Sequence, residues 1–195
     1  GAGVSGLMCA SRLAPCCSSI TVFEWGRGPG GRTARRRASV EGEELVFDHA
    51  CPFFHVRSDE FAAIVHEWAS NGVAAVWEGA HGDDSTPLWV GVESNNSICK
   101  HLSAKLGESM FYAEQVISAH FEKSNSTWQL QSRGRGDDAC MKSHEFDALI
   151  LSDKLLLLPN EYQILEPEEG QGSALELPYV QSHMCVVLMV AIDAA

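Results

Sequence analysis

The sequence predicts an α/β fold built around a parallel sheet, and two features near its start lead to that prediction. The first is a glycine-rich turn, residues 1–6, that runs directly into a helical stretch from about Val4 to Ala14, which Pro15 helps to end. The second is a short apolar strand over residues 20–23, closed by Glu24. A turn, a helix and a strand in this order are typical of one unit of a doubly wound sheet.

The glycine turn has the spacing of a dinucleotide-binding fingerprint. Gly1 allows the tight turn, Gly3 lets the backbone approach a pyrophosphate, and Gly6 permits close packing of helix and strand. Glu24 follows Gly6 by 18 residues and is placed to accept hydrogen bonds from the adenosine ribose hydroxyls. An acid at that point disfavours a 2′-phosphate. These residues predict a Rossmann-type domain with the pyrophosphate at the helix N-terminus.

The strand that normally precedes such a glycine turn is not in this chain, which starts at Gly1. In a doubly wound sheet that first strand is central. We therefore expect the chain to be a fragment of a longer protein or an incomplete gene model.

A loop over residues 25–37 is rich in glycine and arginine. It holds five of the 14 basic residues of a chain whose net charge is −12. Arg32 directly follows Gly30 and Gly31, so its guanidinium is the best-placed contact for a pyrophosphate. The alternative is a solvated basic loop that balances nearby acids. The five residues are Arg27, Arg32, Arg35, Arg36 and Arg37.

Apolar periodicity predicts further elements along the chain. Ser58 is placed as the N-cap of a helix whose apolar face ends at Asn71-Gly72. A second helix begins at about Ser94 and ends at Gly107. Strands are expected over residues 45–47, 88–92, 115–121, 127–131, 146–151 and 184–192, the last of them buried.

Composition and charge exclude several classes of function. An acidic protein is repelled by nucleic acid and by anionic membranes, so neither is an expected partner. The apolar run at residues 184–192 is too short to span a bilayer. The seven cysteines contain no C-x2-C pair and the histidines lack ligand spacing, so we expect no metal site. Free thiols indicate an intracellular, reducing compartment.

Several segments together resemble a known family. The glycine turn, Val22-Phe23-Glu24 and residues 26–32 look like the start of a flavin amine oxidase-type protein. Residues 47–54 resemble that family's D-H-G-A-x-F/Y-F segment, with Ala50 in place of a glycine. Residues 89–98 resemble its Y-V-G-V-P-G-M-N-S/A segment, with Glu93-Ser94-Asn95 in place of Pro-Gly-Met. More narrowly, the chain resembles the renalase-like FAD/NAD(P)-binding oxidoreductases of plants, algae and bacteria.

This resemblance implies an FAD-binding Rossmann-type domain interleaved with a mixed α+β substrate domain. The FAD-binding domain would comprise residues 1–57 and 111–155, and the substrate domain residues 58–110 and a truncated 156–195. Val116 would fix the adenine through backbone groups, and Asp48 and His49 would lie near the flavin ring. The full set of expected cofactor-binding residues is Gly1, Ala2, Gly3, Val4, Ser5, Gly6, Glu24, Trp25, Arg27, Gly30, Gly31, Arg32, Asp48, His49 and Val116.

The implied activity is oxidation of a small reduced substrate, such as a dihydronicotinamide, NAD(P)H included, or an amine, with oxygen as the acceptor. The implied compartment is the cytoplasm or a plastid. The fragment alone is expected to be inactive, because most of the substrate pocket would lie beyond it. The oligomeric state stays open.

Two alternatives remain at this point. One is a Rossmann dehydrogenase that uses NAD alone, and the other is a non-catalytic, truncated nucleotide-binding remnant. His49 beside Asp48 suggests an acid–base pair or simple packing, and Cys51 a redox thiol or an ordinary buried cysteine. The sequence therefore assigns no catalytic residue.

Overall fold

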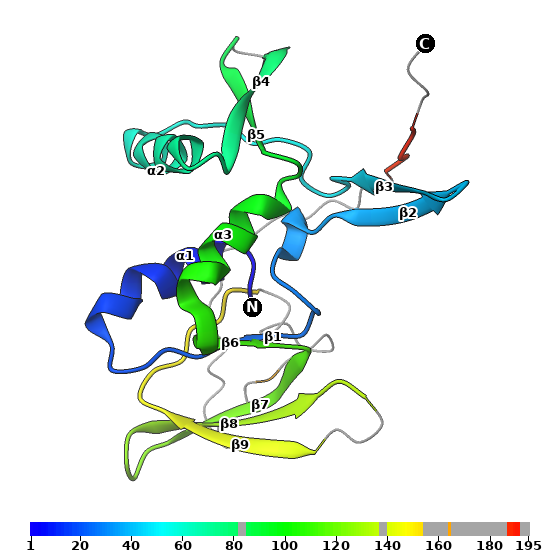
Figure 1. Cartoon of the computed structure of the whole chain (residues 1–195). Coiled ribbons are helices and arrows are strands. Elements are labelled where there is room, and N and C mark those ends of the chain that lie inside the picture. The colour runs from blue at the N-terminus through cyan, green and yellow to red at the C-terminus, as the bar shows by residue number, and fades with distance from the viewer. Residues whose placement is uncertain (82–84, 137–139, 154–163, 165–186, 192–195) are drawn as a thin grey trace.

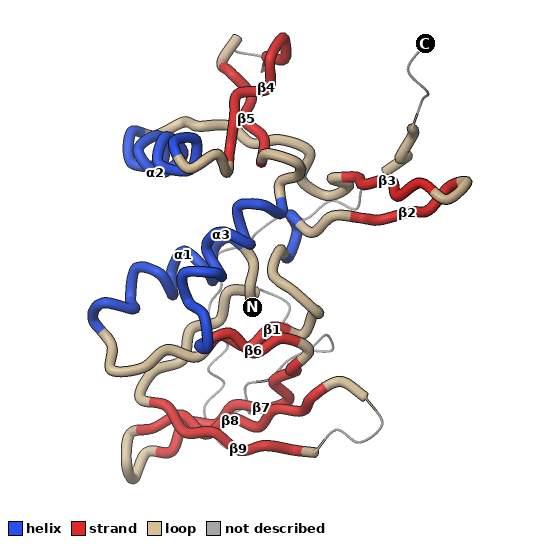
Figure 2. Tube along the Cα trace, in the orientation of Figure 1, coloured by secondary structure: helices blue, strands red, loops and turns tan. Residues whose placement is uncertain are grey.

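A computed structural model describes residues 1–81, 85–136, 140–153, 164 and 187–191 and has a mixed α/β architecture (Figures 1 and 2). Its elements in chain order are α1 (Val4–Leu13), a 3-10 turn η1 (Ala14–Cys16), β1 (Val22–Glu24), η2 (Gly31–Thr33), β2 (Arg36–Val40), β3 (Glu43–Phe47), α2 (Asp59–Ser70), β4 (Ala74–His81), β5 (Pro87–Gly91), α3 (Asn96–Leu106), η3 (Gly107–Ser109), β6 (Met110–Tyr112), β7 (Glu114–Glu122), β8 (Thr127–Gly134) and β9 (Met141–Phe146).

The main core lies where α1 and α3 pack together, as Figure 1 shows. Leu7 of α1 and Cys99 of α3 are fully buried in it, and Val22 of β1 adds to it. Helix α2 contributes Val65 and Trp68, which form the apolar face predicted from their spacing. The burial of these side chains fixes the direction of α1 and α3, and therefore the position of both helix N-termini.

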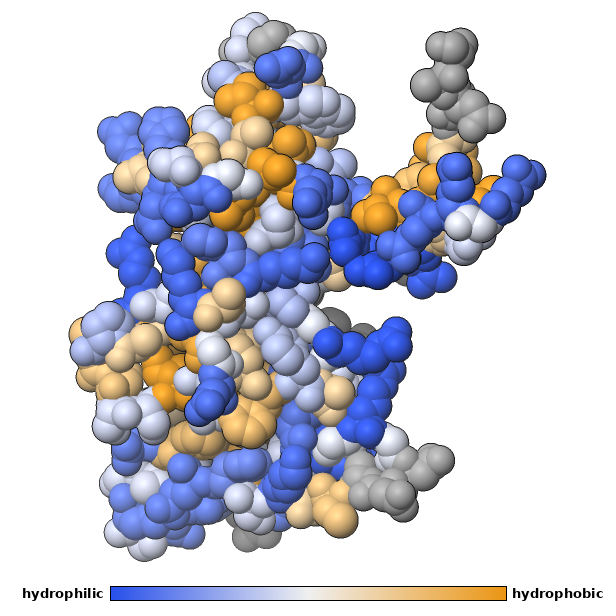
Figure 3. Space-filling model, in the orientation of Figure 1, coloured by the Kyte–Doolittle hydropathy of each residue, from blue (hydrophilic) through white to orange (hydrophobic). Residues whose placement is uncertain are grey.

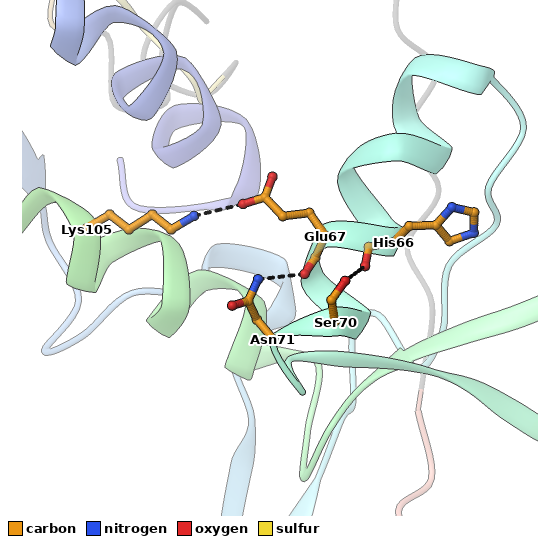
Figure 4. Close-up of polar contacts among 5 residues, drawn as sticks. All are labelled: His66, Glu67, Ser70, Asn71 and Lys105. Atoms are coloured by element: carbon orange, nitrogen blue, oxygen red, sulfur yellow. Dashed lines mark hydrogen bonds and ion pairs between the residues drawn. The ribbon is translucent and has the colours of Figure 1, made fainter.

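An ion pair joins α2 to α3 outside this core. Lys105 Nζ lies 3.2 Å from Glu67 Oε1, and both side chains are about half exposed (Figure 4). At the end of α2, Asn71 Nδ2 donates to the Glu67 carbonyl at 2.7 Å, and Ser70 Oγ donates to the His66 carbonyl at 2.6 Å. These contacts add side-chain donors at the end of the helix, where the Glu67 carbonyl also accepts the backbone N–H of Asn71 at 3.1 Å.

The parallel pairing predicted for the sheet is present in one strand pair. β1 and β6 pair in parallel, with Val22 opposite Met110 and Glu24 opposite Tyr112. The other described strands form an antiparallel pair β2–β3, an antiparallel pair β4–β5 and a three-stranded antiparallel sheet β7–β8–β9. The mixed α/β class is thus confirmed. The interleaved substrate domain and the predicted boundaries at residues 57, 110 and 155 stay predictions.

Two predicted strands are wrong within the described residues. The apolar run at residues 146–151 is not a strand, because β9 ends at Phe146 and no described strand lies beside the residues that follow. Leu149 and Leu151 instead pack against a second core around Ala119, Leu130 and Ile164. Residues 187–191 form no strand and are exposed. Residues 184–186 and 192 of the same prediction lie outside the described part.

Four of the described strands were not predicted from the sequence: β2, β4, β6 and all but the last residue of β9. β2 begins at Arg36, inside the stretch predicted to be a loop, and all five of its residues are exposed. β4 was not predicted at all. The hairpin β2–β3 projects from the body and is mostly hydrophilic on the face seen in Figure 3. Exposed strands lack the apolar alternation by which a strand is recognised. Among the described residues, no helix is long and apolar enough to cross a membrane.

The predicted N-cap of α2 is confirmed and allows a first test. Ser58 Oγ accepts a hydrogen bond from the backbone N–H of Phe61 at 3.2 Å. Replacing Ser58 with alanine is expected to lower the free energy of unfolding by about 1 kcal/mol, because that N–H loses its acceptor. Urea denaturation measures the change, with Ser39→Ala on the exposed strand β2 as the control. Equal urea midpoints for Ser58→Ala and Ser39→Ala would refute the capping role of Ser58.

Candidate functional site

The N-terminus of α1 presents unpaired backbone donors. Its N-cap is Gly3, which has no side chain to cap the helix, and its first turn contains no acidic residue. The first intrahelical bond runs from the Leu7 N–H to the Gly3 carbonyl at 3.0 Å. The earlier N–H groups of the turn are therefore free to bind an anion. A Cβ at Gly6 would overlap the Gly1 carbonyl oxygen, so only glycine fits there.

A second glycine turn lies against this helix end. Gly30 has φ +149° and Gly31 has φ +54°, backbone conformations that favour glycine. The Gly30 N–H donates to the Ala2 carbonyl at 2.8 Å. A Cβ at Gly31 would lie 3.2 Å from the Cα of Gly3. The two turns thus form a cradle without side chains, with the exposed Arg32 at its edge.

Glu24 joins the first turn to the end of β1. Its Oε2 accepts from the Ala2 N–H at 2.7 Å, and its Oε1 accepts from the Gly26 N–H at 2.6 Å. The side chain is half-buried. A carboxylate oxygen can accept more than one hydrogen bond. The Glu24 carboxylate can therefore hold the turn and still accept from a ligand hydroxyl.

A third segment, around Asp48, is linked to the cradle through the start of α3. Asp48 Oδ2 accepts from the backbone N–H of Asn95 at 2.8 Å, just before α3 begins. The next residue, Asn96, donates from Nδ2 to the carbonyl of Pro29 at 2.9 Å. The start of α3 therefore contacts both the segment after β3 and the second glycine turn.

Three buried polar atoms in these segments have no partner among the described residues. They are Asp48 Oδ1, His49 Nδ1 and Asn96 Oδ1. A buried polar atom without a hydrogen bond is costly, and such atoms in a native protein call for an explanation. Two of the three are oxygens, that of the Asp48 carboxylate and that of the Asn96 amide. Both accept hydrogen bonds and cannot donate them. A ligand with N–H or O–H donors would satisfy them.

The two thiols near the cradle are held in the protonated state. Burial raises the pKa of the Cys51 thiol, the charge of Asp48 raises it further, and Arg32 opposes the shift. Burial also raises the pKa of Cys99, and a hydrogen bond with Thr33 opposes that shift. Because the thiolate is the reactive form, neither cysteine is poised as a nucleophile at neutral pH. The structure thus favours the reading of Cys51 as an ordinary half-buried cysteine.

The structure brings together most of the residues proposed from the sequence. The first glycine turn, Glu24, the Gly30-Gly31 pair and Asp48 are linked by the hydrogen bonds above. Trp25 and Arg27 are exposed beside them. Val116 lies in β7, half-buried against the second core, against which Phe23 of β1 also packs. The residue just before β7 contacts the site, because the Ala113 N–H donates to the Gly26 carbonyl at 2.8 Å.

The expectation that the whole basic cluster lies on one flexible loop is wrong. Arg36 and Arg37 belong to strand β2. Arg37 Nη1 lies 3.4 Å from Glu44 Oε1 across the hairpin, and both side chains are exposed. This pairing supports the alternative, in which part of the basic cluster balances nearby acids. Arg27 and Arg32 form no ion pair with any described carboxylate, so they remain available to a phosphate.

Sequence reasoning missed the three residues that connect the segments, Gly91, Asn95 and Asn96. All are buried. Polar residues at the start of a helix with one apolar face usually indicate an N-cap at the protein surface. Here the Asn95 side chain makes no cap hydrogen bond to its own helix. A pair of adjacent asparagines four residues after a strand that ends in glycine was the available indication.

Residues 1–68 match the family model of the NAD(P)-binding Rossmann-like domain. The match covers the first glycine turn, β1, the second glycine turn and the segment around Asp48. The chain thus carries a dinucleotide-binding Rossmann-like domain, whose chemistry fits either FAD or NAD(P). Such a domain is compatible with an oxidoreductase. Within the described ranges, no cluster of three or more His, Cys, Asp or Glu residues could hold a metal ion.

A buried polar network joins the three strands of the sheet β7–β8–β9. Ser132 Oγ donates to Glu114 Oε1 at 2.6 Å and contacts His144 Nε2 at 2.7 Å. Lys142 Nζ lies 2.9 Å from Glu114 Oε2. Because the Ser132 proton goes to the carboxylate, the His144 ring must donate from Nε2. The network therefore joins β7, β8 and β9 around the almost fully buried Glu114.

This network predicts a dependence of stability on pH. The hydrogen bond from Ser132, together with Lys142, lowers the pKa of Glu114. A carboxyl whose pKa is lower in the folded state stabilises the fold above its unfolded pKa, and this stabilisation is lost as the pH falls through the folded pKa. We expect the urea midpoint of the wild type to fall more steeply below about pH 5 than that of Glu114→Gln. Glu44→Gln, at an exposed ion pair, should retain the wild-type slope.

Proposed function

We propose that this chain is the dinucleotide-binding part of an FAD-dependent oxidoreductase of the renalase-like, flavin amine oxidase type. The N-terminus of α1 and the two glycine turns would hold the pyrophosphate. Glu24 would accept from the adenosine ribose, and Arg32 would pair with a phosphate. The residues present fit the ADP half of such a cofactor, because the cradle excludes side chains and leaves backbone donors free.

The observation that carries the choice of FAD is the convergence of further segments on the cradle. The ADP half alone requires only the fingerprint turn and the acid after β1. Here the start of α3 also contacts the second glycine turn through Asn96, and it contacts Asp48 through Asn95. These segments bring buried polar atoms that lack partners, including Asp48 Oδ1 and Asn96 Oδ1. A ligand that continues beyond the pyrophosphate, as the ribityl chain and ring of FAD do, would supply hydrogen-bond donors to them.

When bound, the flavin supplies the redox chemistry by accepting a hydride from a substrate. The residues of this chain would bind and orient the cofactor, and the protonated thiols of Cys51 and Cys99 would take no part in the reaction. The proposed substrate is a small reduced molecule, a dihydronicotinamide or an amine, and oxygen is the proposed acceptor.

The second candidate is a dinucleotide site for NAD(H) alone. The description of the family match favours it, because that description names NAD(P). Glu24 supports NAD over NADP, since a carboxylate at the ribose repels a 2′-phosphate. In this candidate, water rather than a ligand would form hydrogen bonds with the buried polar atoms near Asp48.

The visible absorption spectrum of the purified chain tests the proposal. The chain is expressed with FAD supplied, desalted, and then titrated with FAD and with NAD⁺ while its tryptophan fluorescence is followed. Trp25 follows Glu24 directly and reports on the site. Retention of a yellow, flavin-like spectrum after desalting is expected. A colourless protein that binds NAD⁺ would establish the second candidate. Binding of neither would refute both.

A further inference from the structure

Asn95 makes three hydrogen bonds, two to the segment over residues 48–51 and one to the end of β5. Its backbone N–H donates to Asp48 Oδ2 at 2.8 Å. Its side-chain Oδ1 accepts from the Gly91 N–H at 2.6 Å, and its Nδ2 donates to the Cys51 carbonyl at 2.6 Å. The residue is fully buried. An asparagine before a helix ordinarily caps that helix with its side chain, but Asn95 makes no such bond.

The carboxylate of Asp48 lies at the start of α3. It accepts the backbone N–H of Asn95 and is favoured there by the positive end of the helix. Only one carboxylate oxygen is used, and Asp48 Oδ1 is buried without a partner among the described residues. The orientation of Asp48 therefore depends on where Asn95 lies relative to the segment over residues 48–51.

The side chain of Asn95 fixes that relation. Its amide links the Cys51 carbonyl to the Gly91 N–H, so the segment after Asp48 is joined to the end of β5. The fit is close, because a Cβ at Gly91 would lie 2.7 Å from the Cα of Asn95. Without the amide, two buried backbone groups would lose their partners, and the segment would have to move to regain water.

We propose that Asn95 is a positioning residue of the dinucleotide site. Its amide holds the 48–51 segment so that Asp48 Oδ1 is presented to a hydrogen-bond donor of the bound dinucleotide. This inference rests on the proposed function and extends it to a residue that contacts the ligand only through Asp48.

A double-mutant cycle on FAD affinity tests the inference. Asn95→Ala, Asp48→Ala and the double variant are titrated with FAD and with NAD⁺ by fluorescence, and each variant is also unfolded in urea. Asn95→Ala should weaken binding of the dinucleotide by about tenfold in the wild-type background, as expected for one lost hydrogen bond. In the Asp48→Ala background the same change should alter the affinity less than about twofold.

The matched control is Asn71→Ala. Asn71 Nδ2 also donates to a backbone carbonyl, that of Glu67 at 2.7 Å, but at the far end of α2 (Figure 4). Asn71→Ala should lower the free energy of unfolding slightly and leave the affinity for FAD unchanged. A purely structural role for Asn95 predicts equal losses of affinity in both Asp48 backgrounds, and that result would overturn the inference.

Hydrogen exchange of the wild-type chain covers the case in which Asn95→Ala does not fold. FAD should slow exchange of the amides at residues 48–51 and 91–96 together with those of the glycine turns. Slowing confined to the glycine turns would overturn the inference and leave the proposed function intact. Failure of the wild type to bind FAD or NAD⁺ would overturn the proposed function, and the inference with it.

Discussion

Replacing Gly30 with alanine is expected to weaken dinucleotide binding about 100-fold. The backbone at Gly30 has φ +149°, a conformation in which a Cβ is strained. The Cβ would also overlap the side-chain amide nitrogen of Asn96 and lie 3.1 Å from the backbone of Ala34. Strain and overlap together amount to about 3 kcal/mol, or a factor of about 100 in affinity if the cradle has to open. Fluorescence titration with FAD and NAD⁺ measures the loss.

Gly28→Ala is the matched control in the same loop. A Cβ at Gly28 meets no atom within 4 Å, and its φ lies outside the region that requires glycine. We expect wild-type affinity and an unchanged urea midpoint. If Gly30→Ala and Gly28→Ala bind equally well, the second glycine turn does not form part of the site.

Replacing Glu24 with alanine is the second change with a large expected effect. It removes the acceptors of the Ala2 and Gly26 N–H groups and the proposed acceptor of the ribose hydroxyls. Hydrogen bonds to a charged group contribute about 1.5–3 kcal/mol each, so the affinity should fall at least about 100-fold. The urea midpoint should fall as well, because the two bonds hold the turn in the absence of ligand.

Two further variants separate the possible roles of Glu24. Glu24→Gln keeps one oxygen acceptor but places its NH2 group opposite a backbone N–H donor. Its affinity for the dinucleotide should therefore fall nearly as much as that of Glu24→Ala. Glu44→Ala removes an acid from an exposed ion pair and should change stability by less than about 1 kcal/mol. Wild-type affinity in Glu24→Gln would show that the charge at this position does not matter.

The parts of the site that the sequence predicted share one property. The glycine turn, α1 and Glu24 lie within 24 residues of each other, and their roles follow from local backbone geometry. Helix α2 was predicted for a similar reason, since its apolar spacing and its N-cap are both local. The apolar run after β9 shows the limit of this reasoning: its composition is that of a strand, but a strand also needs a neighbour to pair with.

The sequence by itself determined the dinucleotide-binding turn, the acid that serves it and the mixed α/β class, because each depends on conformational preferences and spacings within a short stretch of chain. Only the tertiary structure decided that Asn95 and Asn96 connect the glycine cradle to Asp48. These contacts join residues 44 to 67 positions apart in the chain. No spacing rule reaches that far, because such contacts are set by the packing of α3 against α1 and not by the local preference of any one residue.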